Sequence, residues 1–243
     1  MAEIVNVDQA AAWDGPQGDL WVEREEMLNA SLVPHTEALL AAADVRRADR
    51  VLDVGCGTGA HLEWLARHYE RAEGIEPSTA MLEQATIARP GLLVYPGDMR
   101  TFRLANRYDV ITCLFSAIGY MTTLGDLHLA VANMAHHLVG GGVLVVEGWI
   151  EPDDWVVGRA SANAAVGDDL AAARVILSDR EDDVSIIEMH YVLATLDSVE
   201  HVDEEHRMGL FTREQYRAAF EAAGLRYERA DGLTGRGLHI GIS

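Results

Sequence analysis

A ten-residue stretch, Val51-Leu-Asp-Val-Gly-Cys-Gly-Thr-Gly-Ala60, combines an apolar run, one acid and three glycines. Glycines at this spacing permit a tight turn and let backbone N–H groups approach a ligand at the start of a helix. Gly55, Gly57 and Ala60 formally satisfy the G-x-G-x-x-G/A pattern of dinucleotide-binding proteins. Asp53 argues against a dinucleotide, because its carboxylate would face a diphosphate, whereas it suits a cofactor with a cationic amino-acid end. The stretch alone leaves open both kinds of cofactor and a glycine turn without a ligand.

Two further acids follow the next predicted strands. Glu76 ends the second strand, where a carboxylate can accept hydrogen bonds from two ribose hydroxyls. Asp98 follows the third strand, where it can accept a hydrogen bond from an adenine amino group while Met99 packs against the ring. Taken singly, Glu76 is also compatible with a solvated strand end, and Gly97-Asp98 with a simple turn. The three acids follow the first three strands in order, and a dehydrogenase has no use for the third.

The elements that position these residues alternate between short β-rich runs and helical periodicity from residue 50 onward. This alternation is typical of a parallel sheet buried on both faces. The expected strands are 50–55, 72–76, 92–95, 108–115 and 143–148, and the expected helices are 61–69, 79–88 and 126–138. Ser78 should cap the second helix, and Gly140-Gly-Gly142 should end the helix before the fifth strand.

The pattern changes after residue 150 to polar, alternating runs. The runs at 173–178, 184–196 and 199–210 predict an antiparallel meander of about three strands. Thr212 should then cap a helix that ends before Gly224, and strands are expected at 225–230 and 238–242. The meander is therefore interpreted as an insertion in an otherwise α/β chain.

Charge and composition limit the classes of ligand. The 39 acidic residues outnumber 19 basic residues, all of them arginine, and the formal net charge is −20. Such a surface repels DNA and RNA, but a few arginines in a pocket can still hold a small phosphorylated substrate. Cys56 and Cys113 form no disulfide framework and no metal-ligand spacing, so we expect no metal. Without a long apolar run or a signal segment, we predict a cytoplasmic protein with no membrane partner.

The ordered acids and glycines resemble the class I S-adenosylmethionine-dependent methyltransferases. Their motifs match Asp53-Val-Gly-Cys-Gly-Thr-Gly59, Glu76, Gly97-Asp98 and Gly140-Gly-Gly-Val-Leu-Val-Val-Glu147. The resemblance implies S-adenosyl-L-methionine as cofactor, with its methionine end in the glycine loop. It also implies a seven-stranded Rossmann-like sheet with helices on both faces, an antiparallel last strand, and the meander as a small insertion. Cofactor contacts are expected from Trp21, Asp53, Gly55, Cys56, Gly57, Gly59, Glu76, Pro77, Met81, Asp98, Met99 and Leu114.

A closer resemblance extends over about residues 50–243. It is to the N,N-dimethyltransferases of nucleotide-linked amino sugars, which methylate the 3-amino group of a TDP-3-amino-trideoxyhexose for macrolide antibiotics. It is carried by Gly97-Asp-Met-Arg-Thr-Phe-Arg-Leu104, Phe115-Ser-Ala-Ile-Gly-Tyr120, Glu188-Met-His-Tyr191, Leu210-Phe-Thr-Arg-Glu-Gln-Tyr216 and Gly235-Arg-Gly-Leu238. The resemblance implies a homodimer and four regions: an N-terminal helical cover (1–49), the cofactor-binding core (50–150), the β insertion for substrate or dimer contacts (151–210) and the closing helix and strands (211–243).

Residues on the acceptor side are expected from their positions in the sequence, and for Tyr120 from the resemblance as well. Tyr120, where the family carries histidine or tyrosine, should orient the amine, Trp149 should wall the sugar or thymine site, and Arg236 should hold the diphosphate. Arg174 and His190 on the meander are weaker candidates. Tyr120, Trp149, Arg174 and His190 are also compatible with a purely packing or solvated role. Trp13 joins them as a substrate contact, since Trp13 and Trp21 are expected in an N-terminal cover over cofactor and acceptor.

Two departures bear on the acceptor. After the fifth strand the chain has Glu147-Gly-Trp-Ile-Glu-Pro152, where the family places a proline and paired tryptophans, and its N-terminal segment has tryptophans in place of tyrosines. Two alternatives therefore stay open. One is a methyltransferase for another small-molecule N or O acceptor, and the other is a protein that binds the cofactor without catalysis.

Overall fold

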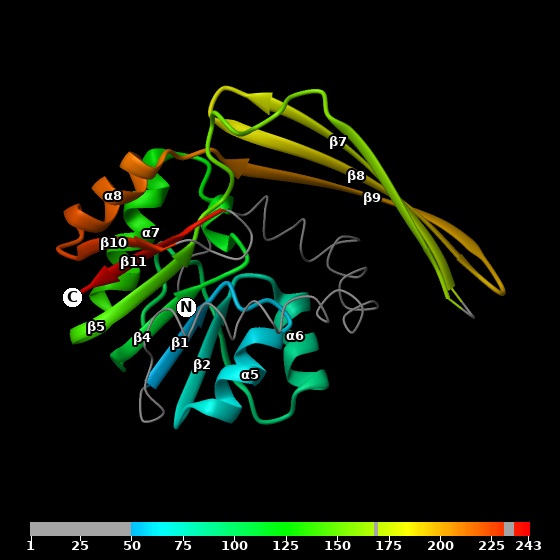
Figure 1. Ribbon diagram of the computed structural model, residues 1–243. Coiled ribbons are helices and arrows are strands. Elements are labelled where there is room, and N and C mark those ends of the chain that lie inside the picture. The colour runs from blue at the N-terminus through cyan, green and yellow to red at the C-terminus, as the bar shows by residue number, and fades with distance from the viewer. Residues whose placement is uncertain (1–49, 168–169, 231–235) are drawn as a thin grey trace.

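The computed structural model describes residues 50–167, 170–230 and 236–243, and they form two β-sheets with helices packed on the larger one (Figure 1). Sheet A has seven strands in the order β10-β11-β5-β4-β1-β2-β3. These strands are β1 (Arg50–Val54), β2 (Arg71–Glu76), β3 (Leu93–Pro96), β4 (Tyr108–Cys113), β5 (Leu138–Glu147), β10 (Arg226–Ala230) and β11 (Leu238–Ile242). Strands β1 to β5 pair in parallel, whereas β11 runs antiparallel to both β5 and β10. The predicted α/β fold with an antiparallel last strand is confirmed.

Among the described residues, four α-helices precede or follow strands of sheet A. They are α5 (Ala60–His68), α6 (Thr79–Ala88), α7 (Leu124–His136) and α8 (Arg213–Ala222). Ser78 Oγ accepts a hydrogen bond from the backbone N–H of Met81, as expected for the cap of α6. Thr212 and Gln215 form a reciprocal capping box at the start of α8, and Gly224 follows its end with a positive φ of 80°. Both predicted caps are confirmed.

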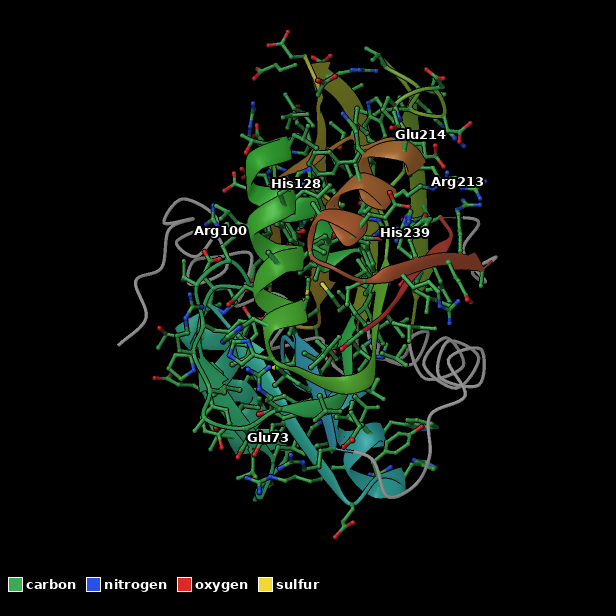
Figure 2. The ribbon with its side chains drawn as sticks, turned by 90° about the vertical axis from the view of Figure 1, so that its left-hand side faces the viewer. Glu73, Arg100, His128, Arg213, Glu214 and His239 are labelled. Atoms are coloured by element: carbon green, nitrogen blue, oxygen red, sulfur yellow. The ribbon has the colours of Figure 1, made fainter. Side chains whose placement is uncertain are left out.

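Side-chain alternation along β1 explains how both faces of sheet A are covered. Leu52 and Val54 belong to the core that contains the buried side chains of α7 and α8, which lie side by side on one face (Figure 2). Val51 points to the other face, where it packs with Leu62 and Leu65 of α5. Because both faces are covered, the central strands are continuous apolar runs that leave few positions for polar side chains except at their ends.

The glycine run Gly140-Gly-Gly142 lies inside β5, so the prediction that it ends the preceding helix is wrong. Helix α7 ends at His136, and the pairing of β4 with β5 shifts from Tyr108 opposite Leu138 to Val110 opposite Val143. A Cβ atom at Gly142 would lie within 3.0–3.2 Å of three backbone oxygens. Gly142 therefore occupies an irregularity in the strand that only a residue without a side chain fits.

Sheet B is a purely antiparallel sheet in the order β6-β7-β8-β9, and it curves outward from the α/β body (Figure 1). Its strands are β6 (Ala160–Val166), β7 (Leu170–Glu181), β8 (Val184–Thr195) and β9 (Val199–Gly209). The structure has four strands where the sequence predicted about three. Strand β6 is alanine-rich and exposed along its length, so it lacks the alternation that signals a strand.

Among the described helices, none has the length and apolar composition needed to cross a membrane. The cytoplasmic location stays a prediction.

Candidate active site

A cavity of about 570 Å³ lies between the carboxyl ends of the central strands of sheet A and one face of sheet B. Its position follows from the strand order. The chain passes from β1 to β2 and β3 on one side of the sheet, and β4 and β5 lie on the other side. This reversal opens a crevice at the carboxyl end of β1, which is where open α/β sheets bind ligands. Predicted site residues that line the cavity are Asp53, Gly55, Cys56, Gly57, Glu76, Pro77, Met81, Asp98, Met99, Leu114, Tyr120, Trp149, Arg174 and Arg236.

Asp53 is the buried acid at the end of β1, with only 2% of its surface exposed. Its carboxylate accepts a hydrogen bond of 2.9 Å from Thr112 Oγ1 on the neighbouring strand β4. Burial raises the pKa of Asp53 to about 6, and the bond from Thr112 opposes part of that rise. Among the described residues, no cation forms a hydrogen bond or ion pair with Asp53. A cationic ligand group would therefore stabilise the ionised carboxylate.

The backbone N–H groups of the glycine loop already bond to protein oxygens. Gly55 N and Cys56 N both donate to Ile75 O, at 2.8 and 3.1 Å, and Gly57 N donates to Glu76 Oε2 at 3.0 Å. These donors are therefore not aimed at a phosphate, which argues against a dinucleotide. At Gly57, where φ is +55°, an added Cβ would have no neighbour within 4 Å, so the backbone itself borders the open cavity.

Gly59 has a different role from the one predicted for it. It caps the start of α5 in the left-handed region, with φ of 87°, and does not line the cavity. A Cβ there would lie 3.0 Å from a methyl group of Leu92. Gly59 therefore serves the helix start and its packing and is not brought to the site.

Glu76 joins the loop to the second helix as well as lining the cavity. Its Oε2 accepts the hydrogen bond from Gly57 N, and its Oε1 accepts one of 3.0 Å from Ser78 N. A carboxylate has about four acceptor positions on its two oxygens, so such a residue can accept from the protein backbone and from ligand hydroxyls together. The geometry fits a residue that fixes the loop and binds a diol.

Asp98 forms a buried ion pair that the sequence motif did not reveal. Arg100 Nη2 lies 2.6 Å from Asp98 Oδ2, and Arg100 Nε donates to Oδ1 at 3.0 Å. Arg100 also donates to Asp126 at 2.7 Å, and these bonds raise its pKa. Because Arg100 neutralises the charge of Asp98, the carboxylate is better suited to accept a hydrogen bond from a neutral amino group than to hold a cation.

Arg236 and Trp149 form one wall of the cavity next to sheet B. The Arg236 guanidinium carbon lies 4.7 Å from the centroid of the Trp149 ring, and Nη1 donates to Ser116 Oγ at 3.0 Å. Trp149 Nε1 in turn donates to Ser185 Oγ of β8 at 2.9 Å. Burial lowers the pKa of Arg236 from its ordinary value, though an arginine stays charged at neutral pH. An anionic ligand group would stabilise the buried positive charge of Arg236.

The chain after β4 takes an unusual conformation to reach this wall. Phe115 and Ser116 have φ angles of 51° and 60°, in the left-handed region that non-glycine residues rarely adopt. Glu147 Oε2 accepts a bond of 2.8 Å from Phe115 N, and Ser116 Oγ donates to Gly148 O at 2.6 Å. These bonds from the end of β5 hold the strained pair, which leads into the 3₁₀ helix η1 (Ala117–Tyr120).

Sheet B contributes alternate residues of its strands to the cavity. Arg174, Tyr191 and His206 line it, whereas His190 is exposed on the opposite face and stacks on His201. The expectation that His190 contacts substrate in this cavity is wrong, because neighbouring residues of a strand point to opposite faces. Residue 190 thus lies on a strand that lines the cavity, but on the other face of sheet B.

Three polar residues that sheet B contributes to the cavity were not predicted from the sequence: Tyr191, Glu204 and His206. Tyr120 Oη and His206 Nδ1 are 2.9 Å apart, and His206 Nε2 lies 3.3 Å from Glu204 Oε2. Tyr191 Oη donates to the same Glu204 oxygen at 3.4 Å. A period of two along 202–208 was visible, but the sequence did not say which set of alternate residues faces the cavity.

Trp13, Trp21 and Gly235 lie outside the described residues. The expected N-terminal cover over cofactor and acceptor therefore stays a prediction.

Comparison with known proteins agrees with this geometry. Residues 51–142 match the family model of a methyltransferase domain. The chain is 40% identical to a dTDP-3-amino-3,6-dideoxy-alpha-D-glucopyranose N,N-dimethyltransferase of Streptomyces fradiae, over 96% of each chain. It is also 40% identical to a dTDP-3-amino-3,4,6-trideoxy-alpha-D-glucopyranose N,N-dimethyltransferase of Streptomyces venezuelae, over 80% of this chain and 83% of that one. The S-adenosylmethionine-bound structure of CalS10, an amino pentose methyltransferase of Micromonospora echinaspora, superposes with a TM-score of 0.78 at 36% identity, covering 99% and 98% of the two chains.

Proposed function

This chain belongs to the methyltransferase family of the dTDP-amino sugar N,N-dimethyltransferases, and on that premise we propose that it dimethylates the amino group of a TDP-linked amino sugar. It is an S-adenosylmethionine-dependent methyltransferase. The observation that carries the proposal is the single cavity that joins the acids of sheet A to Tyr120 and Arg236. One cavity can thus hold a cofactor and an anionic acceptor together.

The residues at the sheet A end fit S-adenosylmethionine. Asp53 would hold its cationic amino group, Glu76 its ribose hydroxyls and Asp98 its adenine amino group, while Met81 and Met99 line the cavity near these acids. When bound, the cofactor supplies a methyl group on a positively charged sulfur that needs no further activation. The protein's own task is to bring the acceptor amine to that methyl group in line and to exclude water.

Tyr120 is the proposed residue for orienting the amine. It lies in η1, directly after the strained pair at the end of β4, and its hydroxyl is held by His206. Holding both reactants in one geometry can supply up to about 7–11 kcal/mol of the barrier reduction. The held hydroxyl and the strained backbone therefore both support positioning as the main source of catalysis.

The nucleotide part of the acceptor would lie toward Arg236, Trp149 and Arg174. Arg236 presents a planar fork of donors that matches a diphosphate, and its ring neighbour Trp149 offers a flat surface to a sugar or base. Arg174 lines the cavity from β7, and its Nε makes no hydrogen bond to the described residues. Both cations face the cavity in a protein whose net charge is −20, which supports an anionic acceptor.

A homodimer is also part of the proposal. The face of sheet B opposite the cavity exposes Val175 and Val192, and its far end exposes Val166, Leu196 and Val199. A second copy of the chain can cover such apolar side chains in a closed twofold arrangement. Sedimentation equilibrium of the full chain tests this: we expect the dimer mass, and a monomer at micromolar concentration contradicts it.

A methyl-transfer assay read by mass spectrometry tests the proposed activity. The panel contains TDP-linked amino sugars, the same amino sugars without the nucleotide, and phenolic acceptors. We expect two methyl groups to be added to a TDP-amino sugar and turnover to be nearly abolished when the nucleotide is removed. Equal turnover without the nucleotide identifies another small-molecule acceptor, and cofactor binding without any turnover identifies a binding protein.

A further inference from the structure

A chain of hydrogen bonds runs from the reacting end of the cavity into sheet B. Tyr120 Oη lies 2.9 Å from His206 Nδ1, and His206 Nε2 lies 3.3 Å from Glu204 Oε2. The side chains of His206 and Glu204 are 8% and 1% exposed, and both border the cavity. Positioning of an amine by Tyr120 alone does not account for a buried acid and a buried imidazole aligned behind its hydroxyl.

The direction of these hydrogen bonds follows from the acid. An ionised carboxylate can only accept, so Glu204 fixes the proton of a neutral His206 ring on Nε2 and leaves Nδ1 as an acceptor. The Tyr120 hydroxyl must then donate to Nδ1. A phenolic oxygen is an acceptor as well as a donor, so an amine or ammonium N–H in the cavity would donate its hydrogen to Tyr120 Oη.

We propose that His206, oriented by Glu204, takes up through Tyr120 the proton that the acceptor's ammonium group must lose before it can be methylated. This inference rests on the proposed function, because it assigns a route for a proton of that acceptor. Tyr120 is the group that contacts the amine, and Glu204 is a positioning residue that acts through His206.

The proton balance of this step involves two transfers. The N–H bond of the ammonium breaks as its proton passes to Tyr120 Oη, and the original O–H bond of Tyr120 breaks as that proton passes to His206 Nδ1. The amine becomes neutral with a free lone pair, Tyr120 is unchanged, and His206 becomes an imidazolium beside the Glu204 carboxylate. The imidazolium then releases its proton to water before the next cycle.

Among the described residues, His206 contacts Tyr120 of η1 and Glu204 of its own strand, and Tyr191 of β8 contacts Glu204 in turn. The negative charge of Glu204 favours an imidazolium, whereas the positive charge of Arg174 on the same cavity wall opposes it. The Arg174 guanidinium lies over the Tyr191 ring, 6.0 Å from its centroid. Glu204 Oε1 makes no hydrogen bond to the described residues. Its charge is thus free to stabilise an imidazolium.

A double methylation needs this route twice. The first methyl transfer converts a neutral primary amine into a secondary ammonium, which has no lone pair until a proton leaves. An enzyme that removes that proton within the cavity can add the second methyl group without releasing the sugar. Loss of the route should therefore show most clearly in the second transfer.

The kinetic test compares His206→Gln, Glu204→Gln and Tyr120→Phe with the wild type across pH. At pH 7 we expect His206→Gln to lower kcat/KM for the acceptor by about 10²-fold or more, in the range of general-base contributions, and monomethylated sugar to accumulate. The loss should shrink as the pH rises, because the amine then arrives neutral. His190→Gln and Glu205→Gln are matched controls, since these side chains of β8 and β9 are exposed on the face of sheet B opposite the cavity.

A second readout does not depend on turnover. In nitrogen-detected NMR of the full chain at alkaline pH, the His206 ring, assigned by its loss in His206→Gln, should carry its proton on Nε2, and Glu204→Gln should shift the proton population toward Nδ1. Circular dichroism verifies that each variant is folded. A pH-independent loss in His206→Gln, or no loss at all in an active enzyme, overturns the inference. A wild type that methylates no amino sugar would overturn the proposed function instead, and the NMR result would still report on the hydrogen-bond chain.

Discussion

Asp53 is a residue at which folding and binding make opposite demands. Burial raises the pKa of its carboxyl from an ordinary 3.8 to about 6 in the folded chain. The stability that the protonated group contributes is fully present below pH 3.8 and is lost as the pH rises through about 6. The difference of about two units corresponds to about 3 kcal/mol at pH 8 in the absence of cofactor. The proposed cationic ligand group binds the ionised form. Cofactor binding therefore offsets the unfolding free energy that ionisation of the buried Asp53 costs.

Replacing Asp53 by Asn separates these two demands. The neutral amide keeps an acceptor for Thr112 and avoids the buried charge, so without cofactor the variant should be up to about 3 kcal/mol more stable than wild type at pH 8, with the gap closing toward pH 4. Its affinity for S-adenosylmethionine should fall about 10- to 150-fold, the loss of one charge-assisted bond. Urea unfolding at both pH values and calorimetry measure the two effects. Equal stability at pH 8 would contradict the raised pKa.

Arg236 permits a prediction about the nucleotide. If it holds the diphosphate, Arg236→Ala should raise KM for a TDP-amino sugar by about 10- to 150-fold with a smaller change in kcat, because the contact is remote from the reacting nitrogen. Arg236→Lys should keep only part of the affinity for the TDP-amino sugar, because a lysine ammonium lacks the forked donors of arginine and its planar packing on Trp149.

The control for Arg236 is the same amino sugar without its nucleotide, measured with both proteins in steady state. Wild type and Arg236→Ala should then be equally poor. Equal impairment of the variant on both substrates would assign Arg236 to the sugar site or to folding.

Among the elements, the contact between β9 and the turn after η1 sets the distance between Tyr120 and His206. Gly209 ends β9, and a Cβ there would overlap the backbone oxygen of Met121 and lie 2.7 Å from the ring of Phe211. Neither is the flexible end of a side chain. Strand and turn are therefore in direct backbone contact, and any side chain at 209 must separate them.

Gly209→Ala should disturb the acceptor side and spare the cofactor side. We expect a loss of about 1–3 kcal/mol in unfolding free energy, typical of overpacking, together with reduced turnover. Affinity for S-adenosylmethionine should stay within about twofold of wild type, because the acids lie on sheet A. Thermal unfolding and calorimetry test this against Gly140→Ala, where an added Cβ meets nothing within 4 Å. A comparable loss in the Gly140 variant would contradict the close-contact explanation.

The sheet A end of the cavity was predictable because its signals are local. Asp53, Glu76 and Asp98 each end or follow a strand within a short motif, and the strand order brings them together. The acceptor end depends on which face of a long antiparallel strand turns inward. Alternation divides the residues of such a strand into two faces but does not tell which face lines the cavity. His190 was therefore predicted as a site residue, and His206 was not.

The whole molecule carries a charge of −20, and this should make cofactor binding sensitive to salt. S-adenosylmethionine bears a positive sulfur that its demethylated product lacks. Raising the ionic strength from about 0.01 to 1 M shortens the screening length from about 30 to 3 Å, so affinity for the cofactor should weaken by about 1 kcal/mol. Calorimetry should find a smaller change for S-adenosylhomocysteine. Equal slopes for both would show that the net charge does not act on the sulfur.

The positions of the cavity residues along the sequence determine how segments could be exchanged between related enzymes. The lining from Asp53 to Met121 comes first and the lining from Trp149 to Arg236 second, while residues 122–148, all described, contribute none. A hybrid joined within α7 or β5 would inherit its donor site from one parent and its acceptor site from the other. Tyr120 and His206 would then come from different parents, so only parents in which these two side chains match should give hybrids that add both methyl groups.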